Sequence, residues 1–192
     1  KEASKLNVPR IGVRFRLPAS MNQVEYFGRG PAENYLDRNA GSMVGLYKST
    51  AEELYFPYVR PQENGHHTDT RWVSLSTGKK GLLIQADNTI GFNALRNSIE
   101  DFDDEEATGL SRQWSNFTPE QVANHDEAAA KSVLRRQHHI NDITPRDFVE
   151  VCVDLKQQGV AGYDSWGSRP EPAYTLPANR EYNWGFTLIP LK

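Results

Sequence analysis

Apolar and polar residues alternate along much of the chain, and this pattern predicts a protein built mainly of β-strands. In residues 10–17, Ile11, Val13, Phe15 and Leu17 alternate with polar residues, which is typical of a strand with one buried face. The other segments that we expect to form strands are 23–27, 42–48, 68–76, 81–86, 89–95, 146–157 and 180–191. Short turns separate most of them, so we expect antiparallel connections.

Segments at the end of the chain carry the strongest strand signals. Residues 146–157 place Val149, Val151, Val153 and Leu155 on one face, with Phe148, Cys152 and charged residues on the other. In the last segment, one face carries Tyr182, Trp184, Phe186 and Leu188. Residues 53–59 are aromatic but contain Pro57, so we expect an edge or an extended crossing segment there.

One segment differs from this pattern and predicts a helix. Thr118-Pro119-Glu120-Gln121 has the cap residue, the early proline and the capping-box residue of a helix start. Residues 122–136 are Ala-rich with few apolar positions, so this helix should lie on the surface. The expected fold class is therefore all-β and mostly antiparallel, with one surface helix, and residues 1–192 should form a single domain.

Composition limits the classes of partner. Among the 192 residues, 22 Lys and Arg oppose 25 Asp and Glu, giving a net charge of −3 with both signs interspersed. We therefore expect neither a nucleic-acid partner nor an anionic membrane surface, since both call for a basic face. Apolar runs are too short to cross a membrane, so we expect a soluble protein of the cytoplasm or periplasm. The first residue is Lys1, which suggests a piece of a longer protein.

Clusters of charged and metal-binding residue types have simple explanations. His66 and His67 are adjacent, and neighbouring strand positions face opposite sides, so we expect no shared metal and no cofactor. The acidic residues of 100–106 lack the spacing of a calcium loop and should be solvated. A local ion-pair network is expected among Arg29, Glu33, Asp37 and Arg38.

The stretch 159–168, Gly-Val-Ala-Gly-Tyr-Asp-Ser-Trp-Gly-Ser, has the composition of a shaped loop at a strand end. Composition alone favours a structural role for its Trp166, because most large aromatic residues are structural. The alternative is a binding role, in which the indole offers a flat face to a ring-shaped ligand and Asp164 or Ser165 forms a hydrogen bond with it.

Three segments, in order, resemble a known family. Residues 27–38 contain G-R-G-P-A-E-N-Y-L-D-R, residues 57–65 read P-Y-V-R-P-Q-E-N-G, and residues 146–167 run from R-D-F through a glycine loop to D-S-W-G. Together they resemble the C-terminal domain of multidomain β-galactosidases of glycoside hydrolase family 2. The resemblance begins near Val8 and continues to the end of the chain.

This resemblance implies a large β-sandwich, a supersandwich similar to galactose mutarotases, of which the chain is the later part. Residues 107–136 would then be an insertion. The parent enzyme would hydrolyse terminal β-D-galactosides with retention, and Trp166 would reach the neighbouring catalytic barrel to stack on the sugar. The resemblance thus reverses the preference for a structural Trp166. No catalytic residue is expected in this chain. The parent's divalent metal and sodium would lie in other domains, and the parent would form a homo-oligomer.

Two other functions fit the residues. A stand-alone carbohydrate-binding module would use Trp72, Trp114, Trp166 or Trp184 on a concave sheet face. A mutarotase-like enzyme would need a general acid and base, for which Glu63, His66 and His139 are the candidates. Asn64 is a further candidate for sugar binding, next to Glu63 in the second motif.

Overall fold

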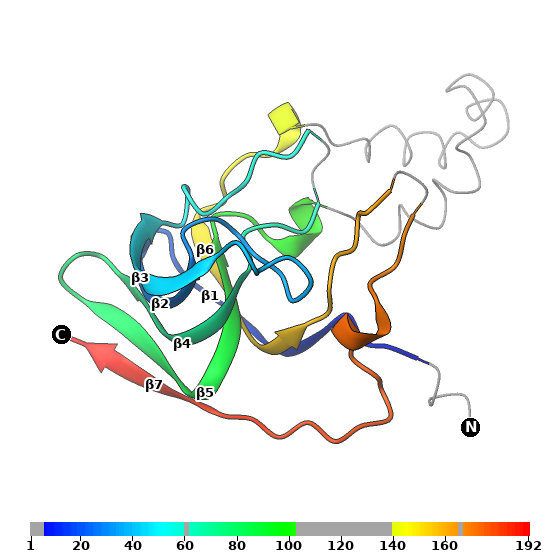
Figure 1. The fold of residues 1–192 in the computed structure, drawn as a ribbon. Helices are drawn as coiled ribbons and strands as arrows, with labels where there is room; N and C mark the ends of the chain where they lie inside the picture. Colours follow the sequence, from blue (N-terminus) through cyan, green and yellow to red (C-terminus); the bar gives the residue numbers. More distant parts are fainter. Residues whose placement is uncertain (1–5, 60–61, 103–139, 165–166) are drawn as a thin grey trace, which may run out of the picture. The chain divides into compact units, whose positions relative to one another are not determined.

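The computed structural model describes residues 6–59, 62–102, 140–164 and 167–192. In these ranges the chain forms one sheet of seven strands in antiparallel pairs (Figure 1). The strands are β1 (Arg10–Pro18), β2 (Gln23–Gly30), β3 (Met43–Thr50), β4 (His67–Ser76), β5 (Gly81–Leu95), β6 (Phe148–Gln157) and β7 (Phe186–Leu191). The described helices are short 3-10 turns: η2 (Ile99–Asp101), η3 (Ile140–Asp142) and η4 (Pro172–Tyr174). The predicted all-β, mostly antiparallel class is confirmed.

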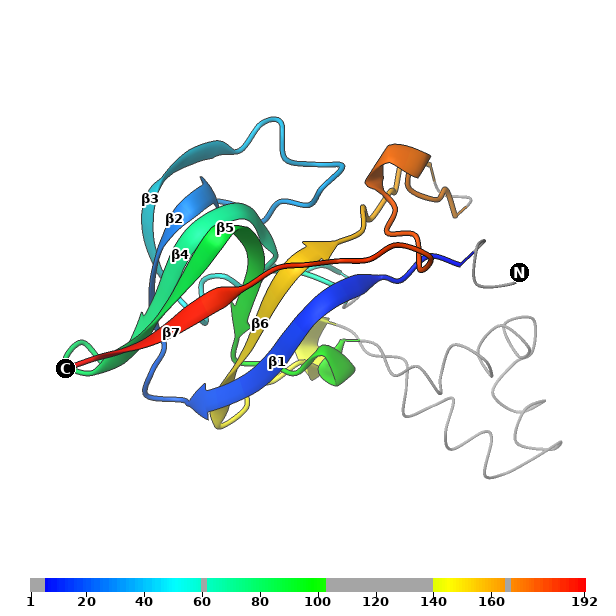
Figure 2. The same cartoon turned by 90° about the horizontal axis from the view of Figure 1, so that it is seen from below.

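The longest strand, β5, organises the sheet. The strand order is β1-β6-β5-β4-β2-β3, and β7 also pairs with β5. The first part of β5, Gly81–Ala86, pairs with β7, and the second part, Gly91–Leu95, pairs with β6. In Figure 2, β7 runs beside β5, and β6 and β1 continue the sheet beyond it. β5 therefore pairs both with the C-terminal strand β7 and with β6, which in turn pairs with the N-terminal strand β1.

Strand β6 is buried on both of its faces. Val149, Val151 and Val153 are fully buried on the apolar face, as the alternation predicted. On the opposite face, Glu150 and Asp154 are buried as well, at 3% and 0% exposure. The rest of the core comes mainly from alternate positions of β2, β4 and β5: Val24, Tyr26, Val73, Leu75, Ile84, Ile90, Phe92 and Ala94. One face of β6 thus joins the apolar core, and the other requires polar partners.

Some predicted boundaries were wrong. The two strands expected at 81–86 and 89–95 are the single strand β5. The last strand begins at Phe186 instead of residue 180. For residues 53–59, an edge or an extended crossing segment was expected, and the edge strand is excluded because these residues belong to no strand. The segment begins within a turn, in which the Leu54 N–H donates to the Thr50 carbonyl at 3.0 Å. The helix predicted at 118–136 lies outside the described residues.

The chain divides into two compact units. The sheet unit comprises Lys1–Phe56, Asn64–Arg96 and Arg146–Lys192. The second unit comprises Pro57–Glu63 and Asn97–Pro145, and its described part includes η2 and η3. Within it, the Ser98 N–H donates to the Asp101 carboxylate at 2.9 Å, and the Asn97 side-chain amide donates to the Thr144 carbonyl at 2.9 Å. No helix in the described ranges is long and apolar enough to cross a membrane.

Candidate functional site

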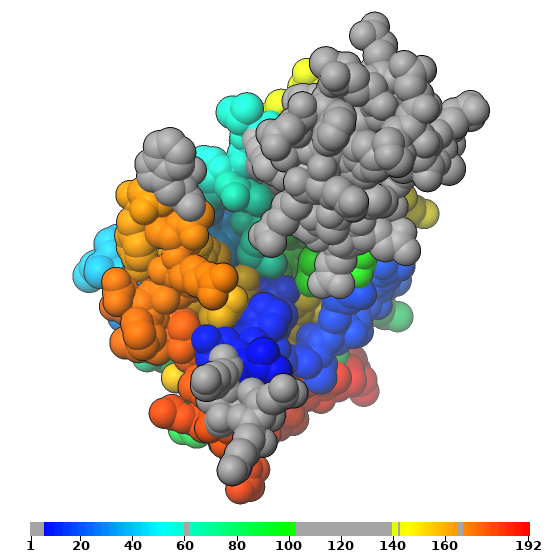
Figure 3. All heavy atoms as spheres, turned by 90° about the vertical axis from the view of Figure 1, so that its right-hand side faces the viewer, coloured from blue at the N-terminus to red at the C-terminus, as the bar shows by residue number. Residues whose placement is uncertain are grey.

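The segment that follows β6 is bound to the N-terminal segment. The Gln158 N–H donates to the Pro9 carbonyl at 2.9 Å, and the Val8 N–H donates to the Leu176 carbonyl at 2.8 Å. Within the segment itself, the Gly159 N–H donates to the Tyr174 carbonyl at 2.8 Å. Figure 3 shows this segment in orange against the blue N-terminal residues. The loop 159–168 therefore begins from backbone that is hydrogen-bonded both to the N-terminal segment and to Tyr174.

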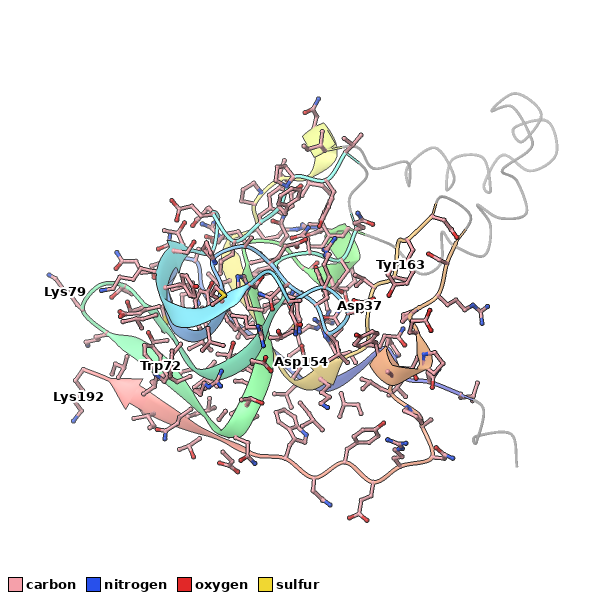
Figure 4. The ribbon with its side chains drawn as sticks, viewed as in Figure 1. Asp37, Trp72, Lys79, Asp154, Tyr163 and Lys192 are labelled. Atoms are coloured by element: carbon pink, nitrogen blue, oxygen red, sulfur yellow. The ribbon has the colours of Figure 1, made fainter. Side chains whose placement is uncertain are left out.

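A carboxylate from a distant motif holds the start of this loop. The Val160 N–H donates to Asp37 Oδ1 at 3.1 Å, and the Ala161 N–H donates to Asp37 Oδ2 at 2.7 Å. The backbone then turns through left-handed conformations, with φ of 55° at Ala161 and 87° at Gly162. Figure 4 shows Tyr163 beside Asp37 at this end of the sheet unit. The first and third sequence motifs, separated by over 120 residues, therefore meet at one side chain.

The next residues form a local turn. The Tyr163 N–H donates to Ser168 Oγ at 3.1 Å, and the Ser168 N–H donates to Asp164 Oδ1 at 3.3 Å. Asp164 is exposed, and the Tyr163 side chain is 59% exposed. Desolvation, followed by the negative charges of Asp37 and Glu171, raises the pKa of Tyr163 above its ordinary value. Asp164 therefore binds the backbone of its own loop.

The turn that presents Asp37 is tightly built. Tyr35 and Arg38 form an isolated β-bridge, with the Arg38 N–H donating to the Tyr35 carbonyl at 2.8 Å. Glu33 accepts hydrogen bonds from the Tyr35 hydroxyl at 3.2 Å and from Arg38 Nη2 at 3.0 Å. The Gly65 N–H also donates to Glu33, at 2.7 Å. Glu33 thus links the first motif to the second.

A second amide continues this link between the motifs. The Asn34 N–H donates to the His66 carbonyl at 2.7 Å, and Asn34 Oδ1 accepts from the Thr68 N–H at 2.9 Å and its hydroxyl at 2.6 Å. The Asn64 carbonyl accepts from Asn93 Nδ2 at 2.7 Å. Asn34 and Asn64 are both buried. These two asparagines therefore bind backbone groups and neighbouring side chains of the scaffold.

The sheet unit also contains a buried polar cluster on the charged face of β6. Arg10 Nε lies 3.0 Å from Asp154 Oδ2, and Arg10 Nη2 donates to Asn93 Oδ1 and Gln157 Oε1 at 2.7 Å each. His66 Nδ1 lies 2.8 Å from Asn93 Oδ1 and 3.9 Å from Asp154 Oδ2. Figure 4 marks Asp154 within the body of the sheet unit. We name these five residues the Arg10 cluster.

Burial determines the charge state of the histidine in this cluster. Desolvation, followed by the positive charge of Arg10, lowers the pKa of His66 to about 3, against the opposing hydrogen bond to Asn93. Neutral His66 carries one ring proton, and Nδ1 must hold it to donate to Asn93 Oδ1. The Tyr35 ring stacks on the imidazole at 5.7 Å between centroids.

The neighbouring His67 faces different residues, as the strand alternation predicted. Its Nδ1 lies 3.1 Å from the Gly65 carbonyl and its Nε2 lies 3.3 Å from the Pro31 carbonyl. The imidazole stacks on Phe92 at 5.0 Å and meets Tyr26 edge-on at 4.9 Å. Within the described ranges, no group of three or more His, Cys, Asp or Glu side chains is placed to hold a metal ion.

The structure thus separates the residues predicted for the site. Asp164 is exposed on the loop, whereas Asn64 and His66 are buried in the sheet unit. Glu63 belongs to the second unit, and Ser165, Trp166 and His139 lie outside the described residues. The predicted local ion-pair network is correct only for Glu33 and Arg38, since Arg29 pairs with Asp69 and Asp37 binds loop backbone.

Sequence reasoning missed the loop-binding role of Asp37. Spacing within residues 27–38 suggested partners nearby, but the groups that bind Asp37 come from Val160 and Ala161. The one available signal was Gly159, where an added Cβ would lie 2.5 Å from the Asp37 carboxylate. A glycine marks such close approach without naming the partner.

Comparison with known proteins identifies the relatives of the chain. The family model described as beta galactosidase small chain matches residues 1–188. The chain is 35% identical over 185 residues to a beta-galactosidase of Priestia megaterium, covering 96% of the chain and 15% of that protein. It is 29% identical over 181 residues to a beta-galactosidase of Vibrio cholerae, covering 94% and 14%. A beta-galactosidase of Arthrobacter sp. is 42% identical over 99 residues, which covers 48% of the chain and 10% of that protein.

Proposed function

Because the chain belongs to the beta galactosidase small chain family, we propose that it forms the sugar-facing C-terminal domain of a β-galactosidase. The chain spans about 15% of the length of the relatives that it matches over nearly its whole sequence. The parent protein hydrolyses terminal β-D-galactosides, and its catalytic barrel is a separate domain of the same polypeptide. This chain supplies Trp166 to that barrel as a stacking platform for the sugar.

The observation that carries this proposal is the anchored loop. The Asp37 carboxylate binds the backbone of Val160 and Ala161, and hydrogen bonds link Tyr163 and Asp164 to Ser168. A ligand-stacking residue needs a fixed backbone on either side, since a platform that moves costs ordering free energy on binding. The described flanks of Trp166 provide that fixed backbone.

The chemistry belongs to the rest of the parent protein. Retaining hydrolysis needs an acid/base carboxyl and a nucleophilic carboxylate about 5–5.5 Å apart on either side of the scissile bond. We assign that pair to the barrel, because no segment of this chain carries the motifs expected for it. The 192-residue chain alone should therefore release no product from a nitrophenyl β-galactoside.

The test is the Trp166→Ala variant in the full-length enzyme. Losing the stacking face should weaken galactoside binding by about 1–2 kcal/mol. This corresponds to about a 5- to 30-fold rise in KM, with kcat changed less, because stacking stabilises the ground state and transition state alike. Trp184→Ala is the matched control, since the Trp184 ring packs on Phe186 at the start of β7. An unchanged KM in Trp166→Ala, with Trp184→Ala also unchanged, would disprove the stacking role.

The isolated chain distinguishes the alternative function. Calorimetry with galactose and lactose should show no binding if the site is completed by the barrel. Binding that Trp166→Ala abolishes would instead support a stand-alone carbohydrate-binding module.

A further inference from the structure

We propose that Asp37 is a positioning residue for galactoside binding, because its carboxylate fixes the backbone that leads into Trp166. The inference rests on the proposed function, since it concerns the same loop. It adds a residue from the first motif, 129 positions before Trp166, to the determinants of sugar affinity.

The first support is the form of the contact. Each oxygen of one carboxylate accepts a different backbone N–H, from Val160 at 3.1 Å and from Ala161 at 2.7 Å. Hydrogen bonds to an ionised acceptor are shorter and about twice as strong as neutral ones. Each donor is matched to an oxygen of its own, an arrangement that a carboxylate provides and that the single oxygen of an amide side chain does not. It fixes two successive peptide groups just before the left-handed turn at Ala161 and Gly162.

The second support is the fit of Gly159. A Cβ at this position would lie 2.5 Å from both Cγ and Oδ2 of Asp37, which is well inside contact distance. The loop backbone therefore rests directly against the carboxylate, and only glycine permits this approach. The acceptor and the residue that makes room for it lie in different motifs.

The third support is the rigidity behind Asp37. Asp37 lies in the turn closed by the Tyr35–Arg38 bridge, and Tyr35 is 1% exposed. The Tyr35 ring stacks on buried His66, and its hydroxyl donates to Glu33. The turn that carries Asp37 is therefore attached to the core through Tyr35. The Asp37 carboxylate is therefore held by a well-packed turn and can fix the position of the loop backbone that binds to it.

The experiment uses the full-length enzyme with three variants: Asp37→Asn, Gly159→Ala and Trp166→Ala. An Asn side chain keeps one acceptor and turns an NH2 donor toward the other peptide N–H, so one of the two bonds is lost. Asp37→Asn and Gly159→Ala should each raise KM for a nitrophenyl β-galactoside, up to the rise of about 5- to 30-fold expected for Trp166→Ala. Hydrogen exchange of the Val160 and Ala161 amides should become faster in both variants.

Two readouts separate positioning from a general structural role. The double variant Asp37→Asn/Trp166→Ala should bind no more weakly than Trp166→Ala alone, because Asp37 acts through the loop. In an Asp37→Ala background, Gly159→Ala should raise KM less than it does in the wild-type background, because Cγ and Oδ2 of Asp37 are gone and only Cβ, at 2.9 Å, remains close. Glu171→Gln is the control, since it removes a negative charge near Tyr163 and should leave KM unchanged.

The outcomes are distinct for the two proposals. If Trp166→Ala raises KM while Asp37→Asn and Gly159→Ala do not, the positioning role is overturned and the proposed function stands. If Trp166→Ala leaves KM unchanged, the proposed function fails, and with it the role of Asp37 in sugar binding. If the effects of Asp37→Asn and Trp166→Ala on KM multiply, Asp37 acts independently of the loop and the inference is refuted.

Discussion

Removing Arg10 should destabilise the sheet unit more than removing any other arginine of β1. Asp154 has a side chain that is 1% exposed, and Arg10 Nε lies 3.0 Å from its carboxylate. Arg10→Met would leave that carboxylate buried without its cation and would remove the donor to Asn93 and Gln157. Breaking a buried ion pair from one side costs about 3–5 kcal/mol, because the remaining charge stays desolvated.

This cost is measured by urea unfolding of the 192-residue chain, followed by circular dichroism. With an m-value of about 2 kcal/mol per M, the midpoint should fall by about 1.5–2.5 M. Arg14→Met is the matched control. The Arg14 side chain is 43% exposed, and its partner Glu150 keeps Arg16 at 3.0 Å, so its loss should cost less than about 1 kcal/mol.

A second substitution identifies the source of the cost. Asp154→Asn removes the buried charge while keeping the shape of the side chain, so the double variant Arg10→Met/Asp154→Asn should be more stable than Arg10→Met alone. The reasoning would be refuted if Arg10→Met cost no more than Arg14→Met. It would also be refuted if neutralising Asp154 made the Arg10 variant less stable.

Two further predictions concern His66. Its folded-state pKa of about 3 lies below the ordinary 6.5, so the unfolded chain binds more protons between these values. The free energy of unfolding should therefore fall as the pH is lowered from 6.5 toward 3, by up to about 1.4 kcal/mol per pH unit. Measured at a series of pH values, the free energy of unfolding of His66→Gln should fall less steeply than that of the wild type. Equal slopes would contradict the lowered pKa of His66. Gly91→Ala places a Cβ 2.5 Å from His66 Cε1 and Nε2, so it should cost about 1–3 kcal/mol in denaturant unfolding. Gly41→Ala, with nothing within 4 Å of the added Cβ, should be nearly neutral, and equal costs for the two would refute the packing explanation.

Strand identity could be predicted from the sequence because the pattern is local. The alternation of Val149, Val151 and Val153 predicted one face of β6, and these residues are fully buried. The burial of Glu150 and Asp154 could not be predicted, because their partners Arg10, Arg14 and Arg16 lie on β1, over 130 residues away. Charged residues on a strand are ordinarily exposed to solvent. The burial of Glu150 and Asp154 becomes clear only from the pairing of β1 with β6.

The loop composition predicted a turn, and the structure has left-handed residues at Ala161, Gly162 and Gly167. What holds that loop was not predictable, since Asp37 could as well have paired with Arg38. Likewise, the apolar face of β1 suggested core burial, but Val13 remains 43% exposed because β1 is the outer strand of the described sheet.

The two unlike faces of β6 have a consequence for how the sheet assembles. A slip of one residue against β1 or β5 would turn the carboxylates of Glu150 and Asp154 toward the valine side and the valines toward the arginines. In a half-buried strand, such a shift exposes the apolar side chains to solvent. In β6 it would also place buried carboxylates in the apolar core, away from their arginines. A shift by one residue is therefore excluded at β6, which constrains the alignment of neighbours that come from the beginning and the middle of the chain.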